Sequence, residues 1–408
     1  MQKEDGAPAP PDSLSRAKQR DVGRAMSAKN AAPDHGANQV PEIRKLFSPV
    51  KVGQLELSHR VVHAPMTRLR SEPDDSPSVM MVEYYVQRAS RGGLVITESA
   101  HPSFDSRGYI GAPGIYTDAH IEAWKRVADA VHVKGGRIFM QIAHDGRQSH
   151  VDLSDGAAPI APSVVPFEGV ALTQNGWVPV SPHRALDIEE IPALVESFRS
   201  AAERAKAAGV DGVEIHNANG YLADTFLQDG TNKRTDAYGG SVENRARFTL
   251  ELVEAFVSVW GPGRVGLRVS PSGQWGAISD SDPEKTFGYL AQQLNRYPLA
   301  YLHVIEPRVK GVETIAEGQA PIASAFLRKI YKGTIISAGG FDARDADATL
   351  QRGDADLVAF GRWFSSNPDL PERFRRNLPL TPYHRDAFWG GDERYYIDFP
   401  QYSDSVGA

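Results

Sequence analysis

Short runs of apolar residues alternate with amphipathic segments along most of this chain, from about Leu46 onward. Eight runs are rich in Val, Ile or Leu and lack a two-residue alternation, which is typical of strands buried on both faces of a parallel sheet. The predicted strands are Arg60–Ala64, Leu94–Glu98, Arg137–Ile142, Gly212–His216, Val265–Val269, Tyr301–Ile305, Thr334–Ala338 and Leu357–Phe360.

The segments between these strands carry helical patterns. In Ile191–Ala208, apolar residues recur at spacings of three and four, which places them on one side of a helix. Ser241 with Asn244–Trp260 forms a second such segment, and residues 282–284 supply an N-cap, a first-turn proline and an acid. Eight strand–helix repeats favour an α/β fold of the (β/α)8 TIM barrel type over the competing doubly wound sheet.

Two segments depart from this rhythm. Residues 1–42 contain few and isolated apolar side chains, so they bury too little to offset the entropy of ordering and are predicted to form a disordered tail. Residues 43–408 are predicted to form one barrel domain with a C-terminal lid segment. Residues 145–187, between the third strand and its helix, are rich in Pro, Gly and Ser. A loop that long is usually functional or folds into a small hairpin over the site.

Composition removes several classes of protein. The 408 residues include 41% hydrophobic and 24% charged side chains, typical of a globular protein with a sizeable core. The net charge of −6 gives no signature of nucleic-acid or membrane binding, and no apolar run reaches the roughly 18 residues of a membrane span. The lack of cysteine excludes disulfides, thiolate nucleophiles and cysteine-bound clusters. With no secretory signal visible, the cytoplasm is the expected location.

Polar residues gather at the carboxyl ends of the predicted strands, where barrels of this type carry their chemistry. Gly339, Gly340 and Gly361 follow strands seven and eight, so backbone N–H groups there can approach an anion closely. Arg362 can bind the same anion, and Asp342 can cap a helix directed at it. This is the pattern of a barrel phosphate site. The alternative is two glycine turns and a surface arginine.

Arg268 lies within the apolar fifth strand. Because an unpaired buried charge is costly, this arginine must face an anion or an electron-rich ligand. The alternative is an ion pair with an interior carboxylate such as Glu98 or Glu214.

Three hydrogen-bond donors, His216, Asn219 and Tyr221, end the fourth strand. Such donors can polarise a carbonyl or nitro oxygen, and a phenol suits proton donation to a developing carbanion. The alternatives are a core histidine, an Asn-Gly turn and a packing tyrosine. Three such residues together favour function over those alternatives.

The stretch from His216 to Leu222, followed by residues 232–248, resembles the old yellow enzyme family. Further matches run in order along residues 43–402: Leu46-Phe47, Ala64 to Arg68, Gly108-Tyr109, Ala112 to Gly114, Gln141, His144 to Arg147, Ile305 to Arg308, Phe360 to Arg362 and Gly390 to Arg394. The resemblance implies an FMN-dependent ene-reductase, similar to N-ethylmaleimide reductase, with NADPH or NADH as reductant.

The resemblance also implies site residues. Thr67 would hydrogen-bond the flavin near N5 and O4, Gln141 and Arg268 would contact its pyrimidine edge, and the glycines with Arg362 would hold its phosphate. The complete predicted FMN set is Ala64, Pro65, Met66, Thr67, Ser99, Gln141, Arg268, Gly339, Gly340, Gly361 and Arg362.

In the implied reaction, reduced nicotinamide passes hydride to flavin N5 and leaves. An activated alkene (an α,β-unsaturated carbonyl, a nitroalkene or a maleimide) then binds through His216 and Asn219. Hydride reaches its β-carbon while Tyr221 protonates the α-carbon. Tyr109, Ala143 and Trp389 are predicted to line the substrate pocket.

Three positions differ from much of the family. Ala143 stands where tryptophan is common, which predicts tolerance of bulkier substrates or altered stereochemistry. Asn219 replaces a histidine found in some relatives, which places the chain in a His/Asn subgroup. Trp389 replaces a common tyrosine, so the lid is expected to differ. His63 is also unusual and is interpreted as a packing residue.

Other functions stay open at this point. One is a different flavin-barrel reductase acting on a nitrate ester or a dienoyl-type substrate, although relatives with a cysteine-bound cluster are disfavoured. A second is a non-catalytic flavin-binding protein, which would need no proton donor. A third is a flavin-free aldolase-type barrel. No metal site is predicted, and the sequence does not separate a monomer from a homodimer.

Overall fold

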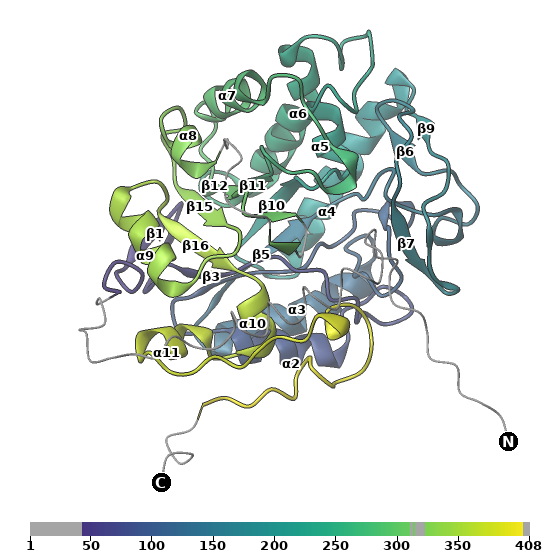
Figure 1. Ribbon diagram of the computed structural model, residues 1–408. Helices are drawn as coiled ribbons and strands as arrows, with labels where there is room; N and C mark the ends of the chain where they lie inside the picture. Colours follow the sequence, from purple (N-terminus) through teal and green to yellow (C-terminus); the bar gives the residue numbers. More distant parts are fainter. Residues whose placement is uncertain (1–42, 311–312, 315–322, 403–408) are drawn as a thin grey trace, which may run out of the picture.

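Eight parallel strands close into a barrel at the centre of the molecule (Figure 1). The computed structural model describes residues 43–310, 313–314 and 323–402. Around the barrel the order is β3 (Val61–His63), β4 (Leu94–Ile96), β5 (Arg137–Ile142), β10 (Gly212–Asn217), β11 (Val265–Val269), β12 (Tyr301–Ile305), β15 (Ile335–Ala338) and β16 (Leu357–Phe360). All eight predicted strands are present, and the TIM-barrel prediction is confirmed.

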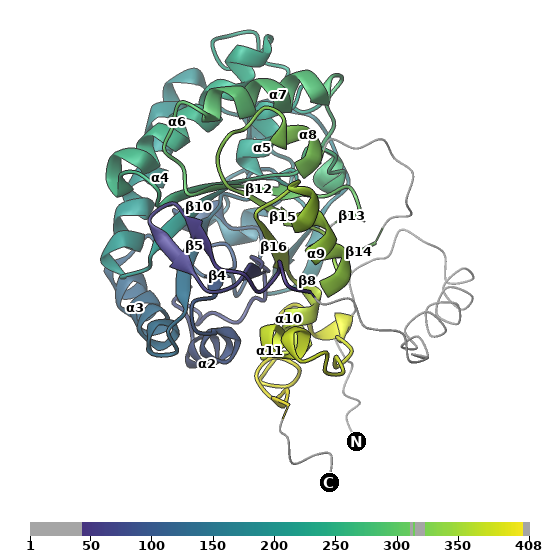
Figure 2. The same cartoon turned by 90° about the vertical axis from the view of Figure 1, so that its left-hand side faces the viewer.

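Helices surround the barrel in both views (Figures 1 and 2). They are α2 (Val79–Arg88), α3 (Asp118–Val133), α4 (Ile191–Ala207), α5 (Leu222–Leu227), α6 (Val242–Trp260), α7 (Pro283–Leu294), α8 (Ser324–Arg328), α9 (Ala343–Arg352), α10 (Arg362–Ser366) and α11 (Leu370–Arg375). Short 3-10 turns cover Phe104–Ser106, Val151–Leu153, Ile188–Glu190, Trp275–Ala277 and Arg385–Ala387.

The predicted helix starts are confirmed by side-chain caps. The Ser241 side chain accepts a hydrogen bond from the Asn244 backbone N–H at the start of α6. Asp282 and Asp342 cap α7 and α9 in the same way. The apolar stripe of α4 is buried against the barrel, as its spacing requires. Side-chain caps at α6, α7 and α9 and the buried stripe of α4 therefore agree with the predictions from local sequence.

The amino end of the barrel is filled with apolar side chains. Phe139 of β5 and Tyr301 of β12 lie against each other inside it, with ring centroids 5.5 Å apart. Gly212 and Gly266 face these rings, and a Cβ atom at either glycine would collide with one of them. The hairpin of β1 (Val50–Val52) and β2 (Leu55–Leu57) adds buried apolar residues to the same cluster. This end is a packed core.

The excursion after β5 folds into small sheets beside the barrel (Figure 1). β7 (Val170–Thr173) and β8 (Gly176–Pro179) form an antiparallel hairpin, and β6 (Ile160–Ala161) pairs with β9 (Arg184–Ala185). Leu172 of the hairpin bridges to Tyr109, a predicted substrate-pocket residue. The predicted hairpin therefore exists and reaches the predicted pocket. A further short pair is β13 (Val309–Lys310) with β14 (Glu313–Thr314).

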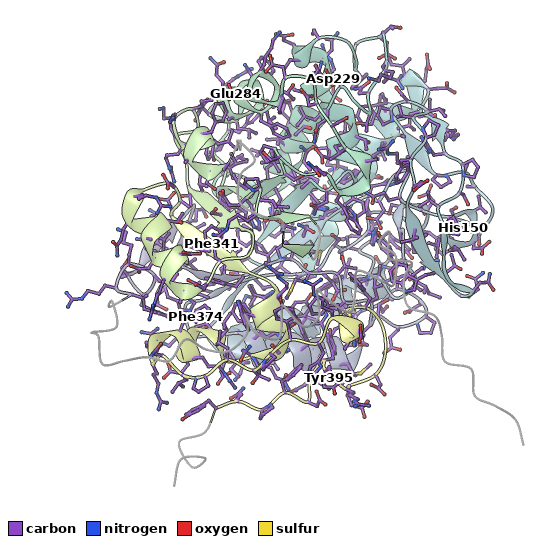
Figure 3. All side chains as sticks on the ribbon, in the orientation of Figure 1. His150, Asp229, Glu284, Phe341, Phe374 and Tyr395 are labelled. Carbon is purple, nitrogen blue, oxygen red and sulfur yellow. The ribbon has the colours of Figure 1, made fainter. Side chains whose placement is uncertain are left out.

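The chain after β16 packs on one side of the barrel. Phe341 and Phe374, labelled in Figure 3, share an apolar cluster with buried residues of β3, β16, α9 and α10. Farther on, the Arg68 Nε donates to the Phe388 carbonyl at 2.9 Å, and the Gly390 N–H donates to the Arg68 carbonyl at 2.9 Å. These bonds hold Trp389 beside the segment that follows β3.

The predicted tail, residues 1–42, lies outside the described residues, so its disorder and the domain limits stay predictions. Within the described ranges, none of the helices has both the length and the apolar character that crossing a bilayer requires.

Candidate active site

The carboxyl end of the barrel interior carries polar side chains. Along β10, Gly212, Glu214 and His216 take alternate positions, and Glu214 and His216 follow the glycine inward. Strand register sets His216 beside Arg268 of β11, and Glu214 beside Gln141 of β5. Three of the predicted site residues therefore meet on adjacent strands.

A buried hydrogen-bonded chain lies beneath this end. The Ser99 hydroxyl donates to Gln141 Oε1 at 2.6 Å, and Gln141 Nε2 donates to Glu214 Oε1 at 2.7 Å. His303 Nδ1 lies 2.9 Å from Glu214 Oε2, and both side chains are fully buried. Burial by itself would raise the pKa of Glu214. The hydrogen bonds from His303 and Gln141 and the positive charge of Arg268 outweigh burial and lower that pKa, so the carboxylate is ionised.

The buried nitrogen atoms without a hydrogen-bond partner at this end include Arg268 Nε, His216 Nδ1 and His303 Nε2. Burial lowers the pKa of Arg268, and the charge of Glu214 opposes that shift. Glu214 is thus the interior carboxylate whose charge reaches Arg268. Glu98 instead accepts hydrogen bonds from the backbone N–H groups of Arg68 and Leu69. Burial and the charge of Arg268 hold the pKa of His216 well below its usual value, so its imidazole is neutral.

The turn after β10 brings the predicted proton donor over the strand end. The Tyr221 hydroxyl lies 3.2 Å from the Tyr109 hydroxyl, and its ring centroid lies 5.2 Å from that of His216. Asn219 adopts a left-handed conformation with φ of 59°, and its N–H donates to the Ser270 hydroxyl at 2.9 Å. Burial, Tyr109 and Asp145 raise the pKa of Tyr221 well above 10, so its phenol is protonated at neutral pH.

The predicted flavin residues after β3 and β16 also come together. The Ala64 N–H donates to the Phe360 carbonyl at 3.0 Å. A Cβ atom at Gly361 would lie 3.2 Å from Met66 Sδ, a tight contact that brings the turn after β16 close to the segment after β3. Pro65 and Thr67 belong to the same segment. Just beyond Thr67, the Arg68 backbone N–H donates to the Glu98 carboxylate and holds the segment in place.

The predicted phosphate residues follow two adjacent strands, β15 and β16. Gly339 and Gly340 have φ values of 126° and 70°, which L side chains rarely adopt. Asp342 caps α9 directly after them, as predicted. Arg362 begins α10, and its guanidinium lies 5.7 Å from the centre of the Tyr383 ring.

Aromatic side chains form a wall beside the two tyrosines. The Trp177 ring lies 6.0 Å from Tyr109 and 5.9 Å from Trp389, centroid to centroid. Leu69, Ala112 and Leu172 pack into the same cluster. Trp177 was not predicted, because nothing in a segment rich in Gly and Pro marks one tryptophan as facing the site. Ala143, the residue predicted to widen the pocket, is fully buried.

His63, predicted to pack, is buried among Tyr84, Tyr85 and Phe364, with Nδ1 3.2 Å from the Ile96 carbonyl oxygen. It takes no part in the site.

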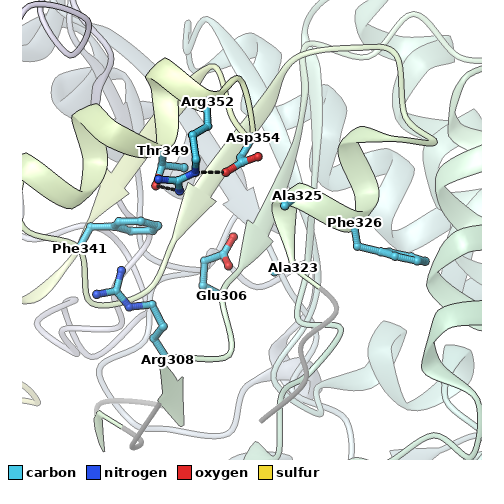
Figure 4. Close-up of a pocket in the computed structure, with 9 residues that line it drawn as sticks. All are labelled: Glu306, Arg308, Ala323, Ala325, Phe326, Phe341, Thr349, Arg352 and Asp354. Atoms are coloured by element: carbon cyan, nitrogen blue, oxygen red, sulfur yellow. Dashed lines mark hydrogen bonds and ion pairs between the residues drawn. The ribbon is translucent and has the colours of Figure 1, made fainter. Parts of the chain in front are cut away.

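A separate pocket of about 300 Å³ lies between α8 and α9 (Figure 4). Its charged side chains already have partners. Arg352 bonds Asp354 at 2.7 Å, and Arg308 bonds Asp345 at 2.8 Å. None of the predicted site residues lines this pocket.

Comparison with known proteins decides the family. A family model described as NADH:flavin oxidoreductase / NADH oxidase matches residues 45–381. The chain belongs to this family. A flavin oxidoreductase of Emericella nidulans is 42% identical over 380 residues, which cover 88% of this chain and 98% of that relative. The 12-oxophytodienoate reductase 2 of Arabidopsis thaliana is 45% identical over 359 residues, covering 87% and 95%.

Solved structures of similar proteins agree. Morphinone reductase in complex with tetrahydroNAD superposes with a TM-score of 0.82 at 46% identity, covering 89% of this chain and 99% of that one. The old yellow enzyme homologue from Zymomonas mobilis gives 0.84 at 39% identity, covering 87% and 99%. The predicted membership of the old yellow enzyme family is confirmed. The chain is an FMN-dependent oxidoreductase that takes its electrons from reduced nicotinamide.

The described residues fit FMN. Arg268 Nε and His216 Nδ1 are buried and unpartnered at the mouth of the barrel, where a planar ligand with oxygen and nitrogen acceptors would satisfy them. Gly339, Gly340 and Gly361 follow two adjacent strands, and none of them carries a side chain that would keep a phosphate from the backbone N–H groups. The unpartnered nitrogen atoms and the three glycines thus lie at the same end of the barrel.

Proposed function

We propose that this oxidoreductase reduces the C=C bond of alkenes activated by a carbonyl or nitro group, with His216, Asn219 and Tyr221 acting on the substrate. The observation that carries the proposal is the meeting of a neutral imidazole and a protonated phenol over one strand end, 5.2 Å apart between ring centres. Binding of a flavin alone would need no proton donor.

For the cofactor, we propose contacts from the eleven predicted residues, with Thr67, Gln141 and Arg268 at the ring and Gly340, Gly361 and Arg362 at the phosphate. FMN, when bound, supplies the hydride that reduced nicotinamide has delivered to it. Arg268 adds positive charge, which favours the reduced cofactor.

The protein's part in the reaction is binding, orientation and proton transfer. His216 and Asn219 donate hydrogen bonds to the substrate's electron-withdrawing oxygen, which stabilises negative charge as it develops. Tyr221 then donates its phenolic proton to the α-carbon. The Tyr109 hydroxyl, 3.2 Å from that of Tyr221, donates to the resulting phenolate. Trp389 and the buried Ala143 shape the substrate pocket from other sides.

Half-reactions measured separately test this proposal. FMN-loaded protein is reduced anaerobically with NADPH or NADH, then mixed with an enone, a nitroalkene, a maleimide and a nitrate ester. Rapid reoxidation by the first three, with a saturated product, supports it. A protein that binds FMN and is reduced but is reoxidised only by oxygen contradicts it.

We also propose that the enzyme is cytoplasmic and a monomer or homodimer, without nucleic-acid partners. The cysteine-free sequence is compatible with a reducing compartment, and the net charge of −6 supports the absence of nucleic-acid partners. Sedimentation velocity and cell fractionation test it.

A further inference from the structure

Glu214 is a buried carboxylate that the proposed reaction does not use. It lies in β10 between the apolar amino end of the barrel and the carboxyl end of the strand, and its side chain is fully buried. Ionised carboxylates are rarely retained at such depth without partners, because removing charge from water is costly. Its partners therefore indicate what it does.

Each carboxylate oxygen holds a different neighbour. Oε1 accepts from the amide of Gln141 at 2.7 Å, and Oε2 lies 2.9 Å from His303 Nδ1. Burial lowers the pKa of His303, so the imidazole is neutral and donates its Nδ1 hydrogen. The Ser99 hydroxyl completes the chain at Gln141 Oε1, at 2.6 Å. The amide of Gln141 is thereby fixed in one orientation.

Glu214 also supplies negative charge close to Arg268. Of the carboxylates, Glu214 has the strongest electrostatic effect on the Arg268 guanidinium. The Nε of Arg268 has no hydrogen-bond partner among the described residues. The two groups lie on adjacent strands, because His216 pairs with Arg268 in the register of β10 and β11. The negative charge of Glu214 therefore offsets part of the positive charge that Arg268 presents to a nearby ligand.

We propose that Glu214 is a positioning residue that sets the reduction potential of the bound flavin, by fixing the Gln141 amide and by offsetting the charge of Arg268. This inference rests on the proposed contacts of Gln141 and Arg268 with the cofactor. Without Glu214, the positive charge of Arg268 acts unopposed and stabilises the reduced, more negative flavin over the oxidised form.

The test is the two-electron potential of FMN-loaded Glu214→Gln, measured by equilibration with a reference dye. We expect reduced FMN to gain about tenfold in binding relative to oxidised FMN, which for a two-electron couple raises the potential by about 30 mV. Glu214→Asp, which keeps the charge but moves it, is expected to fall between wild type and Glu214→Gln.

Asp211→Asn is the matched control. Asp211 precedes the same strand and also binds a histidine, with His132 Nε2 at 2.8 Å, but it lies at the opposite end of the barrel. Loss of this carboxylate is expected to leave the potential unchanged. An equal rise in Asp211→Asn and Glu214→Gln would overturn the inference, because any lost carboxylate would then have the same effect.

Arg268→Gln separates this inference from the function beneath it. If the proposed flavin contact is right, this variant lowers the potential. If Arg268→Gln lowers the potential while Glu214→Gln leaves it unchanged or lowers it, only the role of Glu214 is refuted. A wild-type potential in Arg268→Gln removes the flavin contact, and the inference with it. Should Glu214→Gln fail to fold, Glu214→Asp decides alone: a rise supports the role, and no rise refutes it.

Discussion

The two ends of the barrel use the same strands for opposite purposes. At the amino end, β10 and β11 contribute Gly212 and Gly266, which make room for the rings of Phe139 and Tyr301. At the carboxyl end the same strands contribute His216 and Arg268, each with a buried nitrogen left unpartnered. Apolar side chains fill the amino end, whereas the carboxyl end carries polar side chains, several of them with unpartnered nitrogen atoms. The difference separates the part that maintains the fold from the part that binds a ligand.

The largest contrast between the ends is expected from removing one hydroxyl at each. Tyr221→Phe should slow reoxidation by an enone about 10²- to 10⁴-fold, the usual contribution of a positioned general acid. Reduction by nicotinamide should not change, because hydride transfer to the cofactor needs no phenolic proton. Stopped-flow absorbance of the flavin measures both steps. Tyr331→Phe is the control, since Tyr331 is buried just before β15 at the amino end. Equal reoxidation rates in both variants would show that Tyr221 is not the donor.

Substitutions at the packed amino end should lower the free energy of unfolding. In Gly266→Val the new side chain collides with the Tyr301 ring, and overpacking of this kind costs about 1–3 kcal/mol. Urea unfolding followed by tryptophan fluorescence measures the loss. Gly288→Ala, in α7, meets Ile330 only at ordinary contact distance, so no loss is expected there. If Gly266→Val were as stable as wild type, the amino end of the barrel would not be tightly packed.

Buried histidines at both ends of the barrel should make the free energy of unfolding fall as the pH falls. Burial lowers the pKa of His59 to about 4 near the amino end and that of His144 to about 4 near the carboxyl end. Between the ordinary value near 6.5 and pH 4, the unfolded chain binds protons that the folded protein does not, so stability falls as pH falls. Each histidine contributes up to about 1.4 kcal/mol per pH unit. Urea unfolding from pH 7 to 5 should show a shallower slope in His59→Asn and in His144→Asn. An unchanged slope in either variant would mean that its histidine is already protonated when folded.

The smallest effect concerns the aromatic wall. Trp177→Ala removes one aromatic partner of Tyr109 and Trp389, and such pairs contribute about 0.5–1.5 kcal/mol. The ratio of kcat/KM between a bulky and a small enone should therefore change about two- to tenfold. Steady-state kinetics with both substrates measure it. Trp260→Ala, at the end of α6 on the amino side of the barrel, should leave the ratio as in wild type. A ratio unaffected by Trp177→Ala would exclude this residue from the pocket.

The sequence predicts the barrel well because each strand is a buried apolar run, and each helix start carries its own cap. The sequence also allows His216, Asn219 and Tyr221 to be predicted as a group, since they follow one another at one strand end. Glu214 and His303 were harder to interpret. Their strands lie apart in the sequence, and only the barrel register reveals that one binds the other. Trp177 depends on how a hairpin folds back over the mouth, which no local pattern encodes. The roles of the site residues stay predictions until the variants above are made.

The hairpin of β7 and β8 is an insertion between a barrel strand and its helix, not part of the repeating unit. It reaches the substrate side through Leu172 and Trp177 without contributing a strand to the barrel. Under the proposed function, substitutions in this hairpin are therefore expected to change which substrates the enzyme accepts without touching the strands that carry the proposed FMN contacts. The hairpin is then the part of the chain in which substrate range can be engineered separately from the redox chemistry.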